Sequence, residues 1–259
     1  MVKQCKKGAN LQYVSAKMHQ GGAMYKNIIF DVYGTMVDVW TDEQDIQTWQ
    51  AVASLMDFYG ANLLPEQIKV MFFEGCQKQI AQGKKRYDYP EIDVVKVFYD
   101  ILESQNLGCK TKATFLTHAF RVASTRKLQL FDNVLETLAK LKKAGKKLYI
   151  LSNAQASFTQ FELKKLGLPK YFNGIVLSSK YGVAKPSATF FDIILEKYHL
   201  EKSECIYVGN DLHSDILGAN NAQIHSIWLN TGHLQNDSGH TPTYTIDDGD
   251  FAKICDVVL

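Results

Sequence analysis

Short apolar runs alternate with longer amphipathic runs through the second half of this 259-residue chain, and that alternation restricts the folds it can adopt. The expected strands span residues 147–152, 174–177, 205–209 and 225–229, with a possible edge strand at 244–246. The expected helices span residues 134–144, 158–166, 188–198, 214–222 and 251–258. Strands that alternate with helices predict a parallel sheet with right-handed crossovers, which is an α/β fold.

The first strand of this sheet is expected at Asn27–Phe30, an apolar run typical of a buried parallel strand. Asp31 follows where this strand ends, and Gly34 and Thr35 turn the chain directly afterwards. In open α/β sheets, ligands bind just beyond the carboxyl ends of the strands. Asp31 is therefore a candidate nucleophile or metal ligand, and a turn or capping aspartate is the alternative.

The strand–helix alternation is interrupted after Asp38 by a long segment without strand signals. Four amphipathic helices are expected there, at 42–59, from Pro65, after Pro90 and at 112–127. Four such helices can bury their apolar faces against one another as a small bundle. The expected organisation is an α/β core of residues 24–38 and 129–259, with residues 39–128 inserted as a helical unit.

Residues 1–23 contain four lysines and no acidic residue. They lack the continuous apolar core of a signal peptide. We expect a disordered tail, or the translation product of an upstream start codon with Met24 as the natural beginning.

The overall composition excludes several classes of protein. Hydrophobic residues make up 46% of the chain and charged residues 22%, which is ordinary for a soluble globular protein. A net charge of +2 predicts neither nucleic-acid nor membrane binding. Five scattered cysteines without a Cys-x-x-Cys pair indicate neither a disulfide framework nor a zinc site. Reduced thiols and a cytoplasmic location are the simplest expectation.

Polar residues also follow three later segments of the expected sheet: Ser152, Asn153, Lys185, Asn210, Asp211 and Asp215. Because the carboxyl ends of parallel strands share one edge, these groups are expected to converge on Asp31. Taken singly, each has a plainer explanation as a turn residue, a surface lysine, a helix cap or a first-turn acid. Their recurrence at four strand ends favours a functional site.

The chemistry of this set is that of anion transfer. Neighbouring carboxylates repel unless a cation lies between them, and an all-oxygen set suits Mg²⁺. Magnesium would screen Asp31 from an incoming anion, Lys185 would add positive charge, and Ser152 would hydrogen-bond the transferred group. Asp31 can then attack to form a covalent intermediate that water hydrolyses. Hydrolysis of a phosphate ester of a small molecule fits this chemistry best.

Four segments together resemble the ordered motifs of the haloacid-dehalogenase-like hydrolase superfamily: Phe30–Asp38, Leu151–Asn153, Lys185–Pro186 and Val208–Ala219. The likeness extends over about residues 24–259 and includes the helical insertion, which resembles the cap domain of that family. It implies a Rossmann-like three-layer core, an Asp31 nucleophile, Mg²⁺ as cofactor and a helical-bundle cap that selects the substrate. Most relatives are phosphatases, and one branch hydrolyses carbon–halogen bonds.

The first departure from the phosphatase pattern is Tyr33. Phosphatases of this family usually carry a general acid/base aspartate two residues after the nucleophile. A phenol with a pKa near ~10 suits that role poorly, and loss of a general acid/base costs ~10²–10⁴-fold in rate. The Tyr33 carbonyl can still bind Mg²⁺, and Tyr33 and Asn153 are expected to contact the substrate. The 2-haloacid dehalogenases also show an Asp-x-Tyr-Gly-Thr pattern.

The second departure is Asn210, which stands where the phosphatases place a metal-binding aspartate. A shift of one residue gives that role to Asp211. The expected metal ligands are Asp31, Tyr33, Asn210, Asp211 and Asp215, and the expected catalytic residues are Asp31, Ser152 and Lys185. Dehalogenases need no metal at this position and hold their substrate with an arginine from the start of the cap. No arginine occurs between Asp38 and Lys85.

The preferred function is therefore a Mg²⁺-dependent phosphatase for a small phosphorylated metabolite. The alternatives are a metal-independent 2-haloacid dehalogenase and a binding module that has lost turnover. The segment 83–92, which places three cations beside aromatic residues, is either a substrate contact or a solvated charged loop. The sequence does not predict an oligomeric state.

Overall fold

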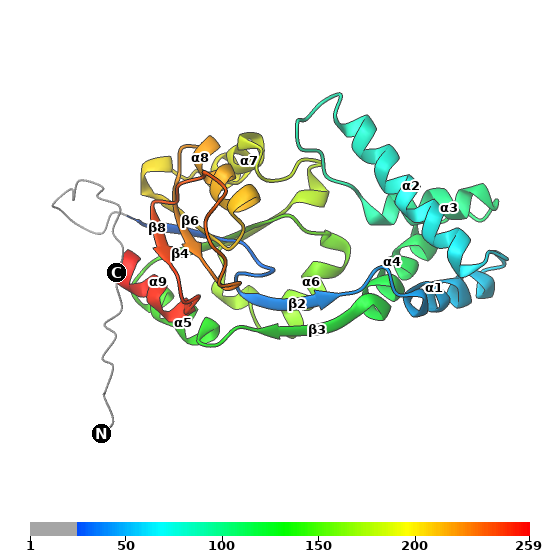
Figure 1. The fold of residues 1–259 in the computed structure, drawn as a ribbon, viewed down its shortest axis with the longest axis horizontal. Coiled ribbons are helices and arrows are strands. Elements are labelled where there is room, and N and C mark those ends of the chain that lie inside the picture. The colour runs from blue at the N-terminus through cyan, green and yellow to red at the C-terminus, as the bar shows by residue number, and fades with distance from the viewer. Residues whose placement is uncertain (1–24) are drawn as a thin grey trace, which may run out of the picture.

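The computed structural model describes residues 25–259, which form an α/β core with a helical unit at one end (Figure 1). Residues 1–23, the predicted tail, lie outside the described range. The strands are β1 (Asn27–Phe30), β2 (Val37–Thr41), β3 (Thr125–Leu130), β4 (Lys147–Ser152), β5 (Gly174–Leu177), β6 (Cys205–Gly209), β7 (His225–Leu229) and β8 (Tyr244–Ile246). The α-helices are α1 (Ile46–Phe58), α2 (Pro65–Gly83), α3 (Val94–Ser104), α4 (Lys110–Ser124), α5 (Val134–Lys143), α6 (Ala156–Lys165), α7 (Ala188–Tyr198), α8 (Leu217–Asn221) and α9 (Ile254–Val258).

The core is a six-stranded sheet in the order β5-β4-β1-β6-β7-β8, and every neighbouring pair is parallel. The predicted α/β class with a parallel sheet is confirmed. β1 lies between β4 and β6, so Phe30 is level with Ile150 on one side and Val208 on the other. The carboxyl ends of these three strands therefore lie side by side.

Helices cover both faces of the sheet and give the predicted three layers. Ile28 and Phe30 of β1 pack into the cluster that contains apolar residues of α5, α6 and α9. Ile29 points the other way, into the cluster that contains residues of α7 and α8. This alternation, with full burial on both faces, explains why β1 is a continuous apolar run rather than an alternating one.

The helical unit has a hydrophobic cluster of its own, built around one aromatic ring from each helix. Trp49 of α1, Phe72 of α2, Phe98 of α3 and Phe120 of α4 lie with ring centroids 4.8–5.8 Å apart. Aromatic rings at these separations add to the free energy gained by burying them. The expected packing of four amphipathic helices is thus present, and the division of the chain into core and cap domains stays a prediction.

Two antiparallel strands connect the core to the helical unit, and the sequence analysis missed both. β2 and β3 pair from Val37↔Leu130 to Thr41↔Thr125 (Figure 1). The prediction that the fourth helix continues through residues 125–127 is wrong, because β-branched Thr125 begins a strand with a partner beside it. Tertiary pairing overrides the local helical pattern here.

Three other boundaries differ from the sequence expectation. The first helix begins at Ile46 rather than residue 42, because Asp45 accepts a hydrogen bond from the Gln47 amide as its N-cap. The expected helix 214–222 is a π-helical turn, Leu212–Ile216, followed by α8. The last helix begins with a 3₁₀ turn at Phe251–Lys253.

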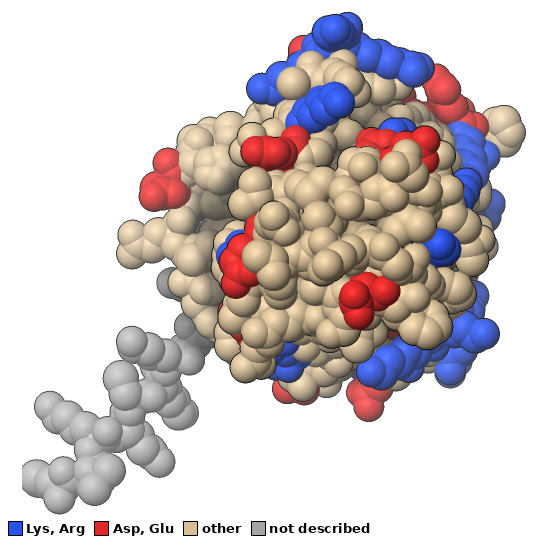
Figure 2. Space-filling view, turned by 90° about the vertical axis from the view of Figure 1, so that its right-hand side faces the viewer, with Lys and Arg blue, Asp and Glu red and all other residues tan. Residues whose placement is uncertain are grey.

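The end of the molecule that carries the helical unit shows mainly uncharged atoms at its centre, with Lys and Arg side chains toward the margins (Figure 2). Acidic side chains are scattered over the same face. None of the helices within residues 25–259 combines the length and hydrophobicity that a bilayer-spanning segment requires.

The aromatic cluster should dominate the stability of the helical unit. Phe72 is 4% exposed and Phe58 is 81% exposed. Phe72→Ala is expected to lower the free energy of unfolding by ~3–5 kcal/mol because it leaves a cavity. The matched variant Phe58→Ala should change it by no more than ~0.5 kcal/mol. Guanidinium unfolding followed by circular dichroism measures both, and equal effects would contradict this packing.

Candidate active site

Three neighbouring strands deliver polar side chains to one small pocket at their carboxyl ends. Asp31 follows β1, Ser152 ends β4 and Asn210 follows β6. Together with Tyr33, Asn153, Lys185, Asp211, Ser214 and Asp215, they line a cavity of about 170 Å³. All residues that the sequence analysis proposed for the site therefore lie around this cavity, and their individual roles stay predictions.

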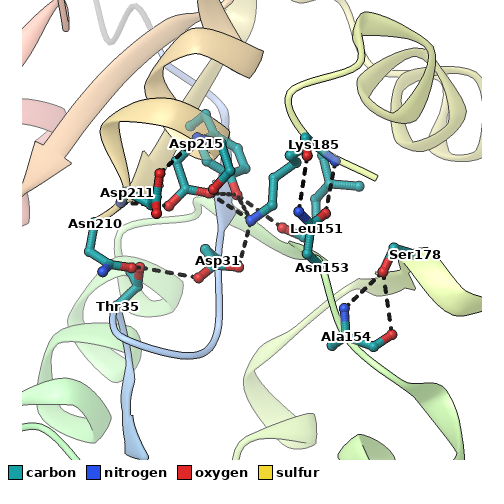
Figure 3. A network of polar contacts seen from close by, with 12 residues as sticks. Asp31, Thr35, Leu151, Asn153, Ala154, Ser178, Lys185, Asn210, Asp211 and Asp215 are labelled. Atoms are coloured by element: carbon teal, nitrogen blue, oxygen red, sulfur yellow. Dashed lines mark hydrogen bonds and ion pairs between the residues drawn. The ribbon is translucent and has the colours of Figure 1, made fainter. Parts of the chain in front are cut away.

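The ammonium group of Lys185 lies between two buried carboxylates (Figure 3). Its Nζ is 2.7 Å from Oδ1 of Asp31 and 2.6 Å from Oδ1 of Asp215. The three side chains are only 2%, 8% and 1% exposed, respectively. The attraction between these charges is strong because water is largely excluded.

Burial and neighbouring charges set the protonation states of Lys185 and Asp215. Burial opposes the charge on Lys185, but Asp215 and Asp31 outweigh it and raise the pKa of the amine. Burial also raises the pKa of Asp215, while the nearby ammonium of Lys185 works against that increase. Lys185 is accordingly protonated and positively charged at neutral pH.

The lysine backbone is held by Asn153. The Asn153 side chain donates from Nδ2 to the Lys185 carbonyl at 3.1 Å and accepts from the Lys185 amide at 2.8 Å (Figure 3). Both polar atoms of this amide group are thus engaged in positioning Lys185. The predicted contact between Asn153 and the substrate stays a prediction.

The second oxygen of Asp31 faces the turn that follows the strand. Thr35 Oγ1 lies 3.5 Å from Asp31 Oδ2 and donates to Asn210 Oδ1 at 3.0 Å. Gly34 has a φ of +80°, and a Cβ there would lie 2.6 Å from Asn210 Nδ2. Only glycine meets both requirements, which explains the Gly-Thr turn after Asp31.

The two aspartates after β6 have different environments. Asp211 Oδ1 accepts from the amides of His213 and Ser214, so this residue caps the turn that follows. Asp215 uses Oδ1 for Lys185 and Oδ2 for the Asp211 amide at 2.9 Å. Asp215 therefore joins the lysine to the loop that carries Asn210 and Asp211.

The phenol of Tyr33 is bound to α6. Its hydroxyl donates to Glu162 and lies 3.0 Å from Thr159 Oγ1. Burial, together with the Glu162 charge, raises the pKa of Tyr33 above its ordinary value. A phenol that is protonated and already donating to Glu162 is not placed to serve as an acid/base for Asp31.

Glu162 and Arg121 are interacting residues that the sequence analysis did not identify. Arg121 Nε and Nη2 donate to the two Glu162 oxygens at 2.6 and 3.0 Å. The guanidinium lies 5.3 Å from the Tyr33 ring centroid and 4.6 Å from that of Phe158. This ion pair joins α4 of the helical unit to α6 of the core. Its partners are 41 positions apart and belong to no common sequence motif, so a linear pattern could not reveal the pair.

Hard oxygen donors in the lining fit Mg²⁺ better than a softer metal. Asp31 and Asp211 supply carboxylates, Asn210 supplies an amide oxygen and Tyr33 lies in the same lining. Within residues 25–259, no group of three or more His, Cys, Asp or Glu side chains is arranged as a metal site. A magnesium ion here would combine one or two of these carboxylates with amide, backbone or water oxygens. Asp215 has both of its carboxylate oxygens engaged.

The helical unit contacts the segment that carries Lys185. Pro90 and Val183 form an isolated antiparallel β-bridge. Next to it, the Ala184 amide donates a hydrogen bond to the Tyr89 carbonyl at 2.9 Å. Beside this bridge, Glu91 accepts hydrogen bonds from Ser178 Oγ at 2.5 Å and from the Ile92 amide at 2.9 Å. Part of the segment 83–92 is thus packed against the core rather than solvated.

The family profile of haloacid dehalogenase-like hydrolases matches residues 28–229, so this chain belongs to that family of hydrolases. It is 38% identical over 101 residues to pyrimidine 5′-nucleotidase YjjG of Escherichia coli, a match that covers 39% of this chain and 45% of that protein. It is 26% identical over 228 residues to the putative HAD-hydrolase YfnB of Bacillus subtilis, with coverage of 86% and 91%. The chain thus spans about half the length of the nucleotidase and most of YfnB.

Solved structures show the same fold. A 2-haloacid dehalogenase from Pseudomonas syringae superposes with a TM-score of 0.63 at 20% identity, covering 90% of this chain and 98% of that one. The magnesium-bound form of YfnB superposes with a TM-score of 0.54 at 20% identity, covering 89% of this chain and 98% of that one. At these identities, the likeness establishes the fold and not the substrate.

The contact made by Glu91 predicts a pH dependence of stability. Burial raises the pKa of Glu91, although hydrogen bonds from Ser178 and Ile92 oppose the increase. The folded protein then binds this proton more tightly than the unfolded chain does, so stability falls as pH rises through the window above about 4.3. The variant Glu91→Gln should lack this decline. Melting temperatures of both proteins across that window provide the test, and parallel profiles would show that Glu91 contributes nothing.

Proposed function

We propose that this hydrolase is a phosphomonoesterase that acts on a small phosphorylated metabolite, with Asp31 as its nucleophile and Mg²⁺ as its cofactor. The observation that carries the proposal is the buried Asp31 carboxylate. Its Oδ1 pairs with Lys185, and within residues 25–259 its Oδ2 has only a long contact with Thr35. Oδ2 is the oxygen available for attack. The lysine lies where it can stabilise an anionic group that reaches the cavity.

The proposed reaction has two steps, attack by Asp31 and hydrolysis of the intermediate. Oδ2 of Asp31 attacks phosphorus, the bond from phosphorus to the ester oxygen breaks, and that oxygen leaves with the electron pair. Water then hydrolyses the acyl phosphate and restores the carboxylate. Ser152 and Lys185 would hydrogen-bond the phosphate oxygens. Bound Mg²⁺, held by Asp31, the Tyr33 carbonyl and either Asn210 or Asp211, would neutralise negative charge on the phosphate.

Two observations favour phosphatase over dehalogenase chemistry. Asp211 places a further carboxylate in the lining, which suits a site for a divalent cation. Arg121, an arginine of the helical unit, is bound to Glu162 through two hydrogen bonds and is only 12% exposed. It would have to break this pair before it could hold the carboxylate of a haloacid. The names of relatives, which include nucleotidases and a glyceraldehyde 3-phosphate phosphatase, support the same choice.

The direct test measures phosphate release from a panel of phosphate monoesters. Removal of metal with EDTA should lower the rate by at least about 10²-fold, and Mg²⁺ should restore it. Asp31→Asn should lower it by on the order of 10³-fold or more. Asp38→Asn is the matched control, because Asp38 pairs with Lys127 in the β2–β3 ribbon, outside the cavity lining. Metal-independent halide release from 2-chloropropionate, without phosphate release, would overturn the proposal.

The position of Tyr33 predicts an unusual dependence on the leaving group. Because its phenol is bound to Glu162, the site lacks an acid at that position to protonate a departing alkoxide. A 4-nitrophenolate needs no protonation, so 4-nitrophenyl phosphate should turn over about 10²–10⁴-fold faster than simple alkyl phosphates. Comparison of kcat/KM for the two classes at one pH measures this ratio, because kcat/KM reports the first step and excludes hydrolysis of the common intermediate. Equal values would show that another group supplies the proton.

A further inference from the structure

A buried tyrosine that the sequence analysis did not select reaches the centre of the site. Tyr207 lies in β6 with no exposed surface. Its ring packs edge-on against Phe191, with the two ring centroids 5.0 Å apart. Cys205 and Tyr207 face the cluster that lies under α7 and α8, as alternation along the strand requires. Tyr207 is level with Ile29 on β1, two residues before Asp31. Its side chain therefore runs beneath β1 toward the strand end.

The hydroxyl of Tyr207 has three polar neighbours from three different elements. It accepts from Lys185 Nζ at 2.8 Å, and it lies 2.9 Å from Asp215 Oδ1 and 3.0 Å from the Leu151 carbonyl. A phenol, with an ordinary pKa near ~10, is protonated at neutral pH. The Tyr207 hydroxyl can therefore accept from the lysine while donating to Asp215 or Leu151.

With Tyr207 included, all three protons of Lys185 have a partner. An ammonium group has three donors, and here they point to Asp31, Asp215 and the Tyr207 hydroxyl at 2.7, 2.6 and 2.8 Å. A buried donor left without a partner costs about as much as a lost hydrogen bond. Removal of the Tyr207 hydroxyl would therefore leave one lysine proton unsatisfied, and either Asp215 Oδ1 or the Leu151 carbonyl would lose a donor.

We infer that Tyr207 is a positioning residue for the reaction, one that holds the Lys185 ammonium in place while Asp31 is consumed as nucleophile. The inference rests on the proposed phosphatase function. Attack through Oδ2 forms a bond to phosphorus, breaks the ester bond and leaves Oδ1 as an uncharged carbonyl of an acyl phosphate. Asp31 then attracts the lysine less strongly. Tyr207 and Asp215 still hold Nζ, and the third N–H becomes free to donate to a phosphate oxygen.

The alternative is that Tyr207 is only a core residue whose hydroxyl is satisfied by the Leu151 carbonyl. The two explanations differ in what they predict for turnover. A core role affects how much protein is folded, whereas a positioning role affects kcat of the folded enzyme. Substrate binding before attack depends little on Tyr207 in either case, because Asp31 still holds the lysine at that stage.

The test is Tyr207→Phe in the full chain, assayed with 4-nitrophenyl phosphate and Mg²⁺. We expect kcat to fall about tenfold, with a range of about 5- to 100-fold, and KM not to rise, because Asp31 still holds the lysine while the substrate binds. Tyr198→Phe is the matched control. Tyr198 belongs to the same side of the core, its hydroxyl accepts from the Ile175 amide at 3.2 Å, and it is not part of the cavity lining. Unchanged kcat in folded Tyr207→Phe would overturn the inference.

A second measurement separates this inference from the proposed function. A double-mutant cycle of Tyr207→Phe with Lys185→Met compares unfolding equilibria and requires no turnover. We expect the two effects to be non-additive by about tenfold in the unfolding constant. If Lys185→Met does not fold, Asp215→Asn replaces it in the cycle. Additive effects would overturn the contact between Tyr207 and Lys185, whereas coupling in a protein without phosphatase activity would overturn the proposed function and leave only the contact in place.

Discussion

A single ammonium group shared by two buried carboxylates is the interaction on which this site depends. Burying three charges is costly, and mutual attraction compensates only when the geometry is good and the remaining donors and acceptors are satisfied. Lys185 meets these conditions with Asp31, Asp215 and the Tyr207 hydroxyl. Each partner comes from a different segment, so the ion pairs form only when β1, β6 and the loop before α7 are in place.

The surrounding structure keeps these segments in register. Asn153, the residue after β4, holds the Lys185 backbone, and Asp215 holds the amide of Asp211. The contacts that the helical unit adds include Pro90 against Val183 and Arg121 with Glu162. Arg121 of the helical unit thus lies against the ring of Tyr33, which itself lines the cavity, so the helical unit supports this side of the site from behind.

The sequence predicted the parallel sheet, and it predicted the convergence of Asp31, Lys185 and Asp215, because strand ends in such a sheet share an edge. It did not reveal Tyr207 as part of the site. Alternation along β6 indicates which face Tyr207 occupies, but not that its hydroxyl passes beneath β1 to Lys185. The Arg121–Glu162 pair was missed for a similar reason, because helical periodicity does not show which helix lies opposite.

The strands β2 and β3 show another limit of local patterns. Their residues are mostly half-exposed, and Thr125–Leu130 follows directly from a helix, so neither run carries a strong strand signal. Each becomes a strand because the other lies beside it, a pairing of residues far apart in the chain. Tyr33 shows a related limit. The sequence shows that a tyrosine stands where phosphatases of this family usually carry an aspartate, but only the structure shows that its phenol donates a hydrogen bond to Glu162.

The central claim is that Asp31 becomes covalently phosphorylated. Rapid acid quenching during turnover of 4-nitrophenyl phosphate, followed by mass spectrometry of peptides, measures this directly. A good leaving group should speed the first step, and the absence of an acid/base at Tyr33 should slow hydrolysis of the intermediate. The account therefore predicts a phosphoryl group on the peptide that contains Asp31. Turnover without any phosphorylated peptide, or with phosphate on a different residue, would contradict it.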